Sequence, residues 1–575
     1  MIDFLFFLSQ LLLFTIICDI VYNMKDKLYK PETYKKYPLN DGRVFNSLQE
    51  TIAALTTEEL CGQLLCLDVY EKDDPAEVEK VISRIKPGGL FVSAMPAEKI
   101  KLYTDMANKY SPVPVIISAD VENGPENGVK GGGLLPYPMA WGACGDENLI
   151  REAGKITARI CRENGIQWTF APIVDINYNF RSAETNVRAV SDDPDAVIKY
   201  AGAYSDGLRS ENLMVTGAKH FPGGGSDERN SHFCTTVNPL SKEEWLNTYG
   251  KVYREMIARG AESIMVGHYS LPSFMPDDEK GLPCVLSKSL MTDLLKGELG
   301  FGGCIVSDAM SMIGACAASD ADKLAVNYLK AGGDMVLFPE DGDYEKILAA
   351  VLSGEISKDR FSDAVNRVLT LKEKAGLFDK EKTVPHADKA ELSAVSQKIA
   401  DKSITVVRDE KNIIPTNIKR GDKILAVIVA EPFWHGEVKI SDYEPFKEQA
   451  ESYGIAVDFL INPKHKAIKE VMFDYDLLVV LCDMSSKNYH GGSMRVGWYN
   501  AMTFWRGYIL EHPKMIFVSL GDPYKLFDYP YLKEYVNAYS NTAESQKAAL
   551  KVISGEIPAT GKNPVSLEGF FKRQI

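Results

Sequence analysis

The stretch Leu213-Met214-Val215-Thr216-Gly217-Ala218-Lys219-His220 decides the fold of this chain. It is an apolar run of the length of a buried strand, and it ends in the two polar side chains Lys219 and His220. Seven similar runs lie between residues 63 and 338, with segments of helical spacing between them. They are residues 63–69, 89–93, 113–120, 168–176, 263–269, 304–310 and 335–338. Eight strands that alternate with helices predict an α/β fold, a TIM-like (β/α)8 barrel of parallel strands.

Polar residues follow the trailing ends of five of these runs. They are Asp120 with Glu122, Asp175, Lys219 with His220, His268, and Asp308. A single Asp or His at a strand end often only caps the next helix. In a (β/α)8 barrel, however, the carboxyl ends of all strands form the active-site face, so the five positions together predict one pocket.

A second α/β unit follows a charged, proline-containing linker near residues 379–389. Its strand-like runs are residues 424–430, 456–461, 477–482, 515–520 and 536–539. They alternate with helices, which predicts an α/β (αβα) sandwich without a dinucleotide or nucleoside-triphosphate motif. The expected organisation is an apolar lead-in at 1–44, the barrel at 45–380, a linker and helix at 381–402, and the sandwich at 403–575.

The composition excludes several classes of function. The 575 residues carry a formal net charge of −14, without a cluster of lysines or arginines, so a nucleic-acid partner is not expected. Ten cysteines show neither a C-x-x-C pair nor zinc spacing, which indicates reduced core thiols and no metal site. A cytoplasmic protein is the favoured interpretation.

The N-terminus leaves three interpretations open. Residues 4–21 are strongly apolar, but Asp3 precedes them and neither a basic region nor a clear cleavage site is present. The segment is a signal-anchor helix, an atypical export signal, or sequence upstream of a true start at Met24. Membrane anchoring or export is expected only if residues 4–21 are a real targeting segment.

The densest polar segment is Lys219-His220-Phe221-Pro222-Gly223-Gly224-Gly225, followed by Ser226-Asp227-Glu228-Arg229-Asn230-Ser231-His232. Three consecutive glycines indicate backbone that passes close to another group, because only glycine lacks a Cβ. Lys219 and His220 offer hydrogen bonds that suit the hydroxyls of a sugar, and His232 can move a proton near neutral pH. The alternative is a flexible loop with a surface histidine.

This segment resembles the signature of glycoside hydrolase family 3, in particular its β-N-acetylglucosaminidase branch. The sequence Asp120-Val121-Glu122-Asn123-Gly124 resembles the Asp-x-Glu-x-Gly substrate loop of the family. Residues 170–176 and 188–194 resemble its arginine-bearing segment, and residues 301–312 resemble its nucleophile strand. The resemblance extends from about residue 57 to residue 567.

The resemblance implies a retaining exo-glycosidase that needs neither a metal nor a cofactor. Asp308 would be the nucleophile of a double displacement, and an acid would protonate the leaving oxygen. The terminal sugar would be held by Asp120, Arg188, Lys219, His220 and His268. Trp168 lies inside a strand-like run, so core packing is expected of it rather than stacking on a sugar.

The acid/base position departs from the family pattern. In that branch, a histidine acts with an aspartate two residues earlier, and here the two positions hold His232 and Asn230. A neutral Asn230 can orient the imidazole but cannot supply the charge that stabilises an imidazolium. We expect His232 to act nonetheless, with slower turnover.

A second departure is Gly224, where the branch usually carries His or Asp. A triple glycine resembles some β-glucosidases of the family, whose acid/base is often a glutamate from the second domain, but residues 483–490 contain none. Glu228, Asp227 and His490 remain as alternatives to His232. The expected function is hydrolysis of terminal β-linked N-acetylglucosamine from oligosaccharides or cell-wall fragments. The alternatives are a β-glucosidase or β-xylosidase and a catalytically weak sugar-binding homologue.

Overall fold

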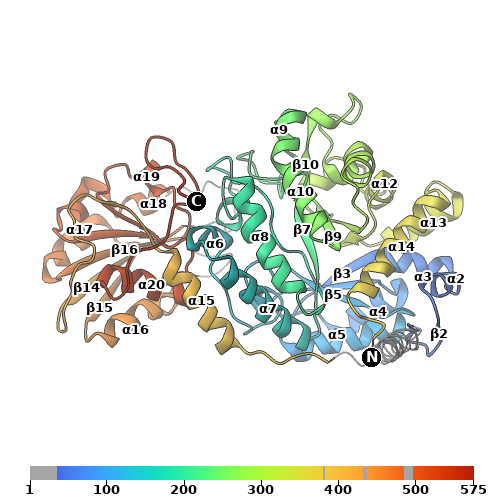
Figure 1. The fold of residues 1–575 in the computed structure, drawn as a ribbon, viewed down its shortest axis with the longest axis horizontal. Coiled ribbons are helices and arrows are strands. Elements are labelled where there is room, and N and C mark those ends of the chain that lie inside the picture. The colour runs from blue at the N-terminus through green and yellow to red at the C-terminus, as the bar shows by residue number, and fades with distance from the viewer. Residues whose placement is uncertain (1–34, 380–382, 432–436, 485–496) are drawn as a thin grey trace, which may run out of the picture.

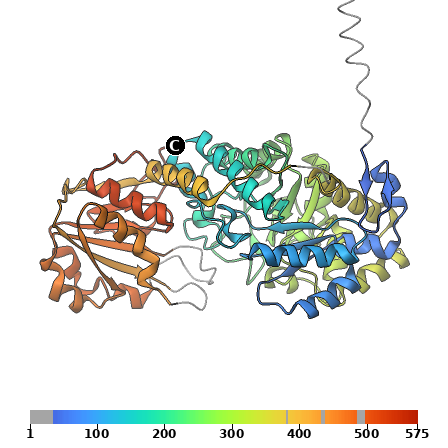
Figure 2. The ribbon, with the colours of Figure 1, turned by 90° about the horizontal axis from the view of Figure 1, so that it is seen from below.

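The computed structural model describes residues 35–379, 383–431, 437–484 and 497–575. Figures 1 and 2 show two units side by side, with helix α6 (Pro138–Cys144) between them and helix α15 (Lys389–Ser403) leading from the first to the second. His490 and the apolar segment 4–21 lie outside the described residues. Within the described ranges, no helix is both long and apolar enough to cross a membrane.

The first unit is an eight-stranded parallel barrel, as the sequence predicted. Its strands are β3 (Leu65–Val69), β4 (Gly89–Val92), β5 (Ile116–Ala119), β6 (Trp168–Thr169), β7 (Val215–Phe221), β9 (Ser263–Val266), β11 (Cys304–Ser307) and β12 (Val336–Leu337). They pair in the order β11-β9-β7-β6-β5-β4-β3-β12. A parallel bridge between Val306 and Met335 joins the two ends and closes the ring.

Helices surround the barrel. They are α3 (Thr57–Gln63), α4 (Pro75–Ile85), α5 (Ala97–Tyr110), α7 (Glu147–Glu163), α8 (Pro194–Arg209), α9 (Lys242–Asn247), α10 (Tyr249–Ala258), η5 (Ser289–Glu298), α11 (Ile313–Cys316), α12 (Leu324–Ala331), α13 (Asp343–Ser353) and α14 (Lys358–Lys374). Local sequence sets several of their starts, because Thr56 with Glu59 and Ser241 with Glu244 form capping boxes that satisfy free amides. Short pairs complete the unit: β1 (Tyr37–Pro38) with β2 (Val44–Phe45), which precede α2 (Leu48–Ala53), and β8 (Thr236–Val237) with β10 (Tyr269–Ser270).

The second unit is a six-stranded sheet in the order β13-β18-β17-β16-β14-β15. Its strands are β13 (Thr405–Asp409), β14 (Lys423–Ala430), β15 (Ala456–Ile461), β16 (Leu477–Asp483), β17 (Met515–Ser519) and β18 (Glu534–Asn537). Strand β13 pairs antiparallel with β18, and the other neighbours are parallel. The sequence did not predict β13, which lies at the edge of the sheet. The helices of this unit are α16 (Glu444–Ser452), α17 (His465–Val471), α18 (Trp498–Ala501), α19 (Lys525–Asp528) and α20 (Ala543–Ser554).

The two faces of this sheet have different partners. Alternate residues of β14 point to opposite faces. Leu425 and Val427 share a core with Met139 of α6 and Val187 of the barrel unit. Residues of the other face, such as Ala426, pack with helices α15, α16 and α20. One face of the sheet therefore shares its core with residues of the barrel unit as well as with its own helix α17.

Candidate active site

The predicted site residues come together at the carboxyl end of the barrel. Asp120 follows β5, Lys219 and His220 lie near the end of β7, and Asp308 follows β11. Asp308 N donates to Val266 O of β9 at 2.9 Å, which fixes the start of the Asp308 loop on the neighbouring strand. The closing of the barrel thus places side chains that lie far apart in the sequence within one site.

Two cations and two carboxylates form a tight cluster on one side. Lys219 Nζ lies 2.6 Å from Asp120 Oδ1 and 2.7 Å from Glu122 Oε1. Arg188 binds Glu122 through two bonds, 2.7 Å from Nη2 and 3.0 Å from Nε. Burial opposes the ionisation of Glu122, but Arg188 and Lys219 outweigh it and hold the pKa of this carboxyl well below its ordinary value. The Asp120 side chain is 40% exposed, so it is the member of the cluster that a ligand can reach.

His220 joins this cluster to the predicted nucleophile. Its Nδ1 lies 2.7 Å from Asp175 Oδ2, and its Nε2 lies 4.0 Å from Asp308 Oδ2. Burial by itself would lower the pKa of His220, but the charge and hydrogen bond of Asp175 raise it above its ordinary value. Because Asp175 accepts a hydrogen bond from the Nδ1–H group of His220, the opposite ring nitrogen, Nε2, faces Asp308.

Asp308 is held in its ionised form. Ala309 N donates to Asp308 Oδ1 at 2.8 Å. Burial favours the neutral acid and so acts to raise the pKa of this carboxyl. The charges of His220 and Lys219 act against burial, and the pKa lies below its ordinary value. An ionised carboxylate whose side chain remains 14% exposed can attack a bound carbon, as a nucleophile must.

His268 contacts the backbone next to Asp308. Its Nε2 lies 2.9 Å from Ala309 O, and the residue is fully buried. Burial lowers the pKa of this imidazole, which favours its neutral form. The structure therefore connects His268 to the backbone that follows the nucleophile. Trp168, in contrast, is buried in the core and donates from Nε1 to Ser263 Oγ at 2.8 Å, which confirms the packing role predicted for it.

The three glycines of the loop lie against other parts of the barrel. A Cβ on Gly223 would lie 2.1 Å from the Tyr249 ring, and one on Gly225 would lie 2.0 Å from Ile176 O. A Cβ on Gly224 would meet the Tyr269 hydroxyl at 2.9 Å. The sequence predicted that this backbone passes close to another group, and that group is another part of the same chain. The Tyr269 ring leaves no room for a side chain at position 224.

The loop that carries His232 is ordered by its own side chains. Asn230 Oδ1 accepts a bond from His232 N at 3.0 Å and lies 2.7 Å from His232 Nδ1. An amide oxygen can only accept, so Nδ1 carries a proton and Nε2 is the nitrogen that exchanges one. Ile313 N donates to His232 O at 3.2 Å, which places the loop on the segment that follows Asp308.

The other carboxylates of the loop have different surroundings. Asp227 Oδ2 accepts from Val237 N at 2.9 Å, and Asp227 pairs with Arg229, so it stabilises the loop itself. Glu228 is exposed. Neither shows the oriented contact that Asn230 gives His232.

Sequence reasoning missed one buried carboxylate and undervalued two more. Glu184, 3% exposed, accepts from Ser231 N at 3.1 Å and from Ser231 Oγ at 2.6 Å. Glu122 and Asp175 were noted at strand ends and within segments that resemble the family, but no role was assigned to them, and they prove to be the partners of Arg188, Lys219 and His220. Glu184 had no signal in the sequence, because it lies in a loop and its contact is 47 residues away.

The second unit supports the loop that carries Glu184 and Arg188. Asn177 Nδ2 donates to Tyr524 OH at 3.0 Å, and Ser191 Oγ donates to Pro564 O at 2.5 Å. Phe180 lies between these two positions in the sequence, and its ring packs on that of Phe527 with centroids 4.8 Å apart. The sheet unit therefore holds both ends of the loop that supplies these two residues.

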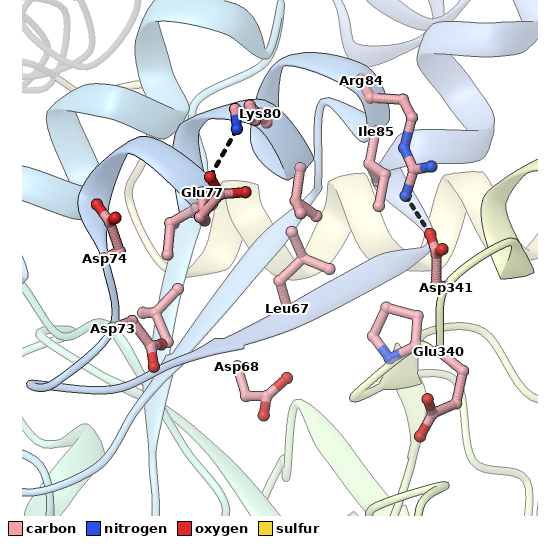
Figure 3. Close-up of a pocket in the computed structure, with 14 residues that line it drawn as sticks. Leu67, Asp68, Asp73, Asp74, Glu77, Lys80, Arg84, Ile85, Glu340 and Asp341 are labelled. Atoms are coloured by element: carbon pink, nitrogen blue, oxygen red, sulfur yellow. Dashed lines mark hydrogen bonds and ion pairs between the residues drawn. The ribbon is translucent and has the colours of Figure 1, made fainter.

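A separate hollow of about 760 Å³ lies between helix α4 and the loop after β12 (Figure 3). Leu67 and Ile85 contribute apolar surface, and charged side chains surround it, with Lys80 bound to Glu77 and Arg84 bound to Asp341. None of the predicted site residues lines this hollow. Among the described residues, no group of His, Cys, Asp and Glu is arranged to hold a metal ion.

Comparisons with known proteins identify the family of this chain. The family model described as glycosyl hydrolase family 3 N terminal domain matches residues 56–371. A β-N-acetylglucosaminidase/β-glucosidase of Cellulomonas fimi is 30% identical over 550 residues, which cover 90% of this chain and 95% of the relative.

Solved structures with the same architecture include two of similar length. A family 3 β-N-acetylglucosaminidase from Paenibacillus sp. str. FPU-7 is 26% identical with a TM-score of 0.77, covering 91% of this chain and all of that one. The β-glucoside phosphorylase BglX is 28% identical with a TM-score of 0.81, covering 90% of this chain and 95% of that one.

Proposed function

The chain belongs to glycosyl hydrolase family 3 and is a glycoside hydrolase, and from this premise we propose that it releases terminal β-linked N-acetylglucosamine from oligosaccharides or cell-wall fragments. One observation carries the proposal. An ionised Asp308 lies 4.0 Å from His220, next to the loop in which Asn230 orients His232. A nucleophile and a proton donor are thus provided by neighbouring segments, as double displacement requires.

The reaction has two steps. In the first step, Asp308 Oδ attacks the anomeric carbon while His232 Nε2 donates its proton to the departing oxygen, so one C–O bond forms as another breaks. In the second step, His232 takes a proton from water, and the water oxygen displaces Asp308 from the anomeric carbon. Both displacements invert the carbon, so the product retains the β configuration.

The charged cluster around Lys219 grips the terminal sugar. Asp120 is the exposed member, Lys219 behind it fixes its orientation, and Arg188 holds the neighbouring Glu122. Charge-assisted bonds of this kind discriminate between sugars, because a missing hydroxyl leaves a buried charged group unpaired. Such a grip on the last sugar favours exo action, with the rest of the chain directed out of the site.

Two relatives support N-acetylglucosamine as the sugar. The Cellulomonas protein is named as acting on both N-acetylglucosaminides and glucosides, and the Paenibacillus protein is named as a β-N-acetylglucosaminidase. The triple glycine keeps a β-glucosidase or β-xylosidase as the alternative.

Phosphorolysis is a second candidate for the step that frees the sugar. The structure of BglX, similar over 90% of this chain, is titled a β-glucoside phosphorylase. The neutral Asn230 beside His232 also favours it, because a carboxylate at that position would repel a phosphate dianion that enters there. Phosphate would then replace water in the second step, and the product would be a sugar phosphate.

The test uses 4-nitrophenyl N-acetyl-β-glucosaminide and 4-nitrophenyl β-glucoside, each with and without inorganic phosphate. We expect faster release from the glucosaminide, and release from neither by Asp308→Ala. Preference for the glucoside would move the assignment to a β-glucosidase, and a sugar phosphate among the products would favour the phosphorylase. Binding of both sugars without release would identify a sugar-binding homologue.

A further inference from the structure

Glu184 connects the two halves of the site. Its side chain accepts two hydrogen bonds from Ser231, and its main-chain oxygen accepts one from Arg188 Nη1 at 3.0 Å. Arg188 in turn binds Glu122 in the cluster that contains Lys219. One residue is thus joined both to the groups that grip the sugar and to the loop that carries the proton donor.

The contact point on that loop is the residue directly before His232. Ser231 donates to Glu184 from both its amide and its hydroxyl, so the carboxylate fixes the main chain and the side chain together. On the other side, Ser231 O packs so closely against Gly314 that an added Cβ there would lie 2.3 Å away. Ser231 is therefore held between Glu184 and the segment that follows the nucleophile.

Asn230 and Glu184 act on this loop through different contacts. Its bonds to His232 span two residues, so they orient the imidazole within the loop. Glu184 belongs to a different segment, 47 residues away, and anchors the loop to it. Burial, together with the negative charge of Glu184, raises the pKa of Tyr269 above its ordinary value.

We propose that Glu184 is a positioning residue for acid/base catalysis, which holds His232 over Asp308 through its paired bonds to Ser231. This inference rests on the proposed role of His232. A displacement of about 1 Å at a reacting group can cost on the order of a hundredfold in rate, so an anchor at the adjacent residue has a large effect on turnover.

The chain offers a matched control for this residue. Glu262 is also buried, at 8% exposed, and it accepts bonds from an amide and a hydroxyl, those of Thr216, at 3.1 and 3.2 Å. It precedes β9 and so lies at the opposite end of the barrel. Glu262 also pairs with Arg209 at 2.7 Å, so Glu262→Ala removes the same kind of amide and hydroxyl contacts as Glu184→Ala and an ion pair in addition, and it does so at the other end of the barrel.

The first measurement is hydrogen exchange of the peptide that spans residues 230–235, which needs no activity. We expect exchange to rise by roughly tenfold in Glu184→Ala and to stay unchanged in Glu262→Ala, because only the first loses the acceptor of the Ser231 amide. Unchanged exchange in Glu184→Ala overturns the proposal. If that variant does not fold, Ser231→Ala removes the 2.6 Å bond alone and is expected to raise exchange in the same peptide.

The second measurement compares leaving groups. Dinitrophenolate departs without acid help, whereas methanol needs it, so a misplaced His232 selectively slows the methyl glycoside. We expect Glu184→Ala to lose roughly 10- to 100-fold in kcat/KM on methyl N-acetyl-β-glucosaminide and less than about threefold on the 2,4-dinitrophenyl glycoside. An equal loss on both overturns the positioning role. If the unaltered protein cleaves neither substrate, the proposed function is wrong. The hydrogen-exchange measurement still tests whether Glu184 holds the Ser231 loop in place.

Discussion

Lys372 of helix α14 allows a quantitative test of the barrel. Its side chain is fully buried, and its Nζ donates to the neutral Gln63 Oε1 at 2.5 Å. Burial lowers the pKa of Lys372 from 10.5 to about 7. At ~1.4 kcal/mol per pH unit, this shift corresponds to about 5 kcal/mol of penalty on the charged form. Replacement by Met removes that penalty, but it leaves Gln63 unpaired at a cost of about 1–3 kcal/mol.

The sign of the effect follows from linkage. Below pH 7 both the folded and the unfolded protein carry the proton, so the full penalty destabilises the folded state. Between pH 7 and 10.5 only the unfolded protein carries it, and the stability of the unaltered protein rises with pH. We therefore expect the unfolding free energy of Lys372→Met at pH 6 to exceed that of the unaltered protein by about 2–4 kcal/mol. Between pH 6 and pH 9 this difference should fall by about 3 kcal/mol, because the unaltered protein becomes more stable.

The assay is urea unfolding of both proteins at pH 6, 7.5 and 9, with tryptophan fluorescence as the readout. Lys358→Met, an exposed position at the start of the same helix, is the control and should show no such pH dependence. A stability difference between Lys372→Met and the unaltered protein that stays constant from pH 6 to pH 9 would refute the reasoning, because the lysine would then not change its charge on folding in this range.

Three further substitutions probe the site. Arg188→Met leaves Glu122 with Lys219 alone, so we expect a loss of about 3–5 kcal/mol in urea unfolding and at least about a hundredfold in kcat/KM; full activity would contradict the sugar grip. Gly224→Ala brings a Cβ to 2.9 Å from the Tyr269 hydroxyl and should cost about 1–3 kcal/mol, part of which Tyr269→Phe in the same protein should recover. Asn230→Asp gives His232 a charged partner and should speed turnover of methyl N-acetyl-β-glucosaminide by about tenfold; slower turnover would mean that a neutral partner is required there.

Much of the barrel was predictable because a strand buried on both faces is a continuous apolar run. All four residues of β11 are buried, for example, and its run was recognised from the sequence. The run at 168–176 was predicted too long, since β6 ends at Thr169. Pro172 follows closely and has no amide to donate to a ladder.

Strand β13 shows the limit of the same reasoning. It ends in Arg408 and Asp409, four of its five residues are only partly buried, and it pairs with one neighbour at the edge of the sheet. An edge strand contacts solvent on one side, so its sequence need not be apolar. The apolar pattern that predicts a central strand is therefore absent.

The site also contains residues that the sequence could predict and one that it could not. Residues at strand ends were found because the barrel closure brings every strand end to one face, as for Asp308 and Lys219. Glu184 could not be found, because its position depends on how the loop between β6 and α8 folds onto the Ser231 loop. Tertiary contacts between two loops leave no periodic pattern in either sequence.

The central claim is that Asp308 attacks the anomeric carbon. The most direct measurement is the mass of the protein and its peptides after reaction with 5-fluoro-N-acetyl-β-glucosaminyl fluoride, whose good leaving group speeds the first step relative to the second. The account predicts an adduct of one sugar on the peptide that contains Asp308, and no adduct in Asp308→Asn. An adduct on a peptide that contains Asp227 or Glu228 would contradict it.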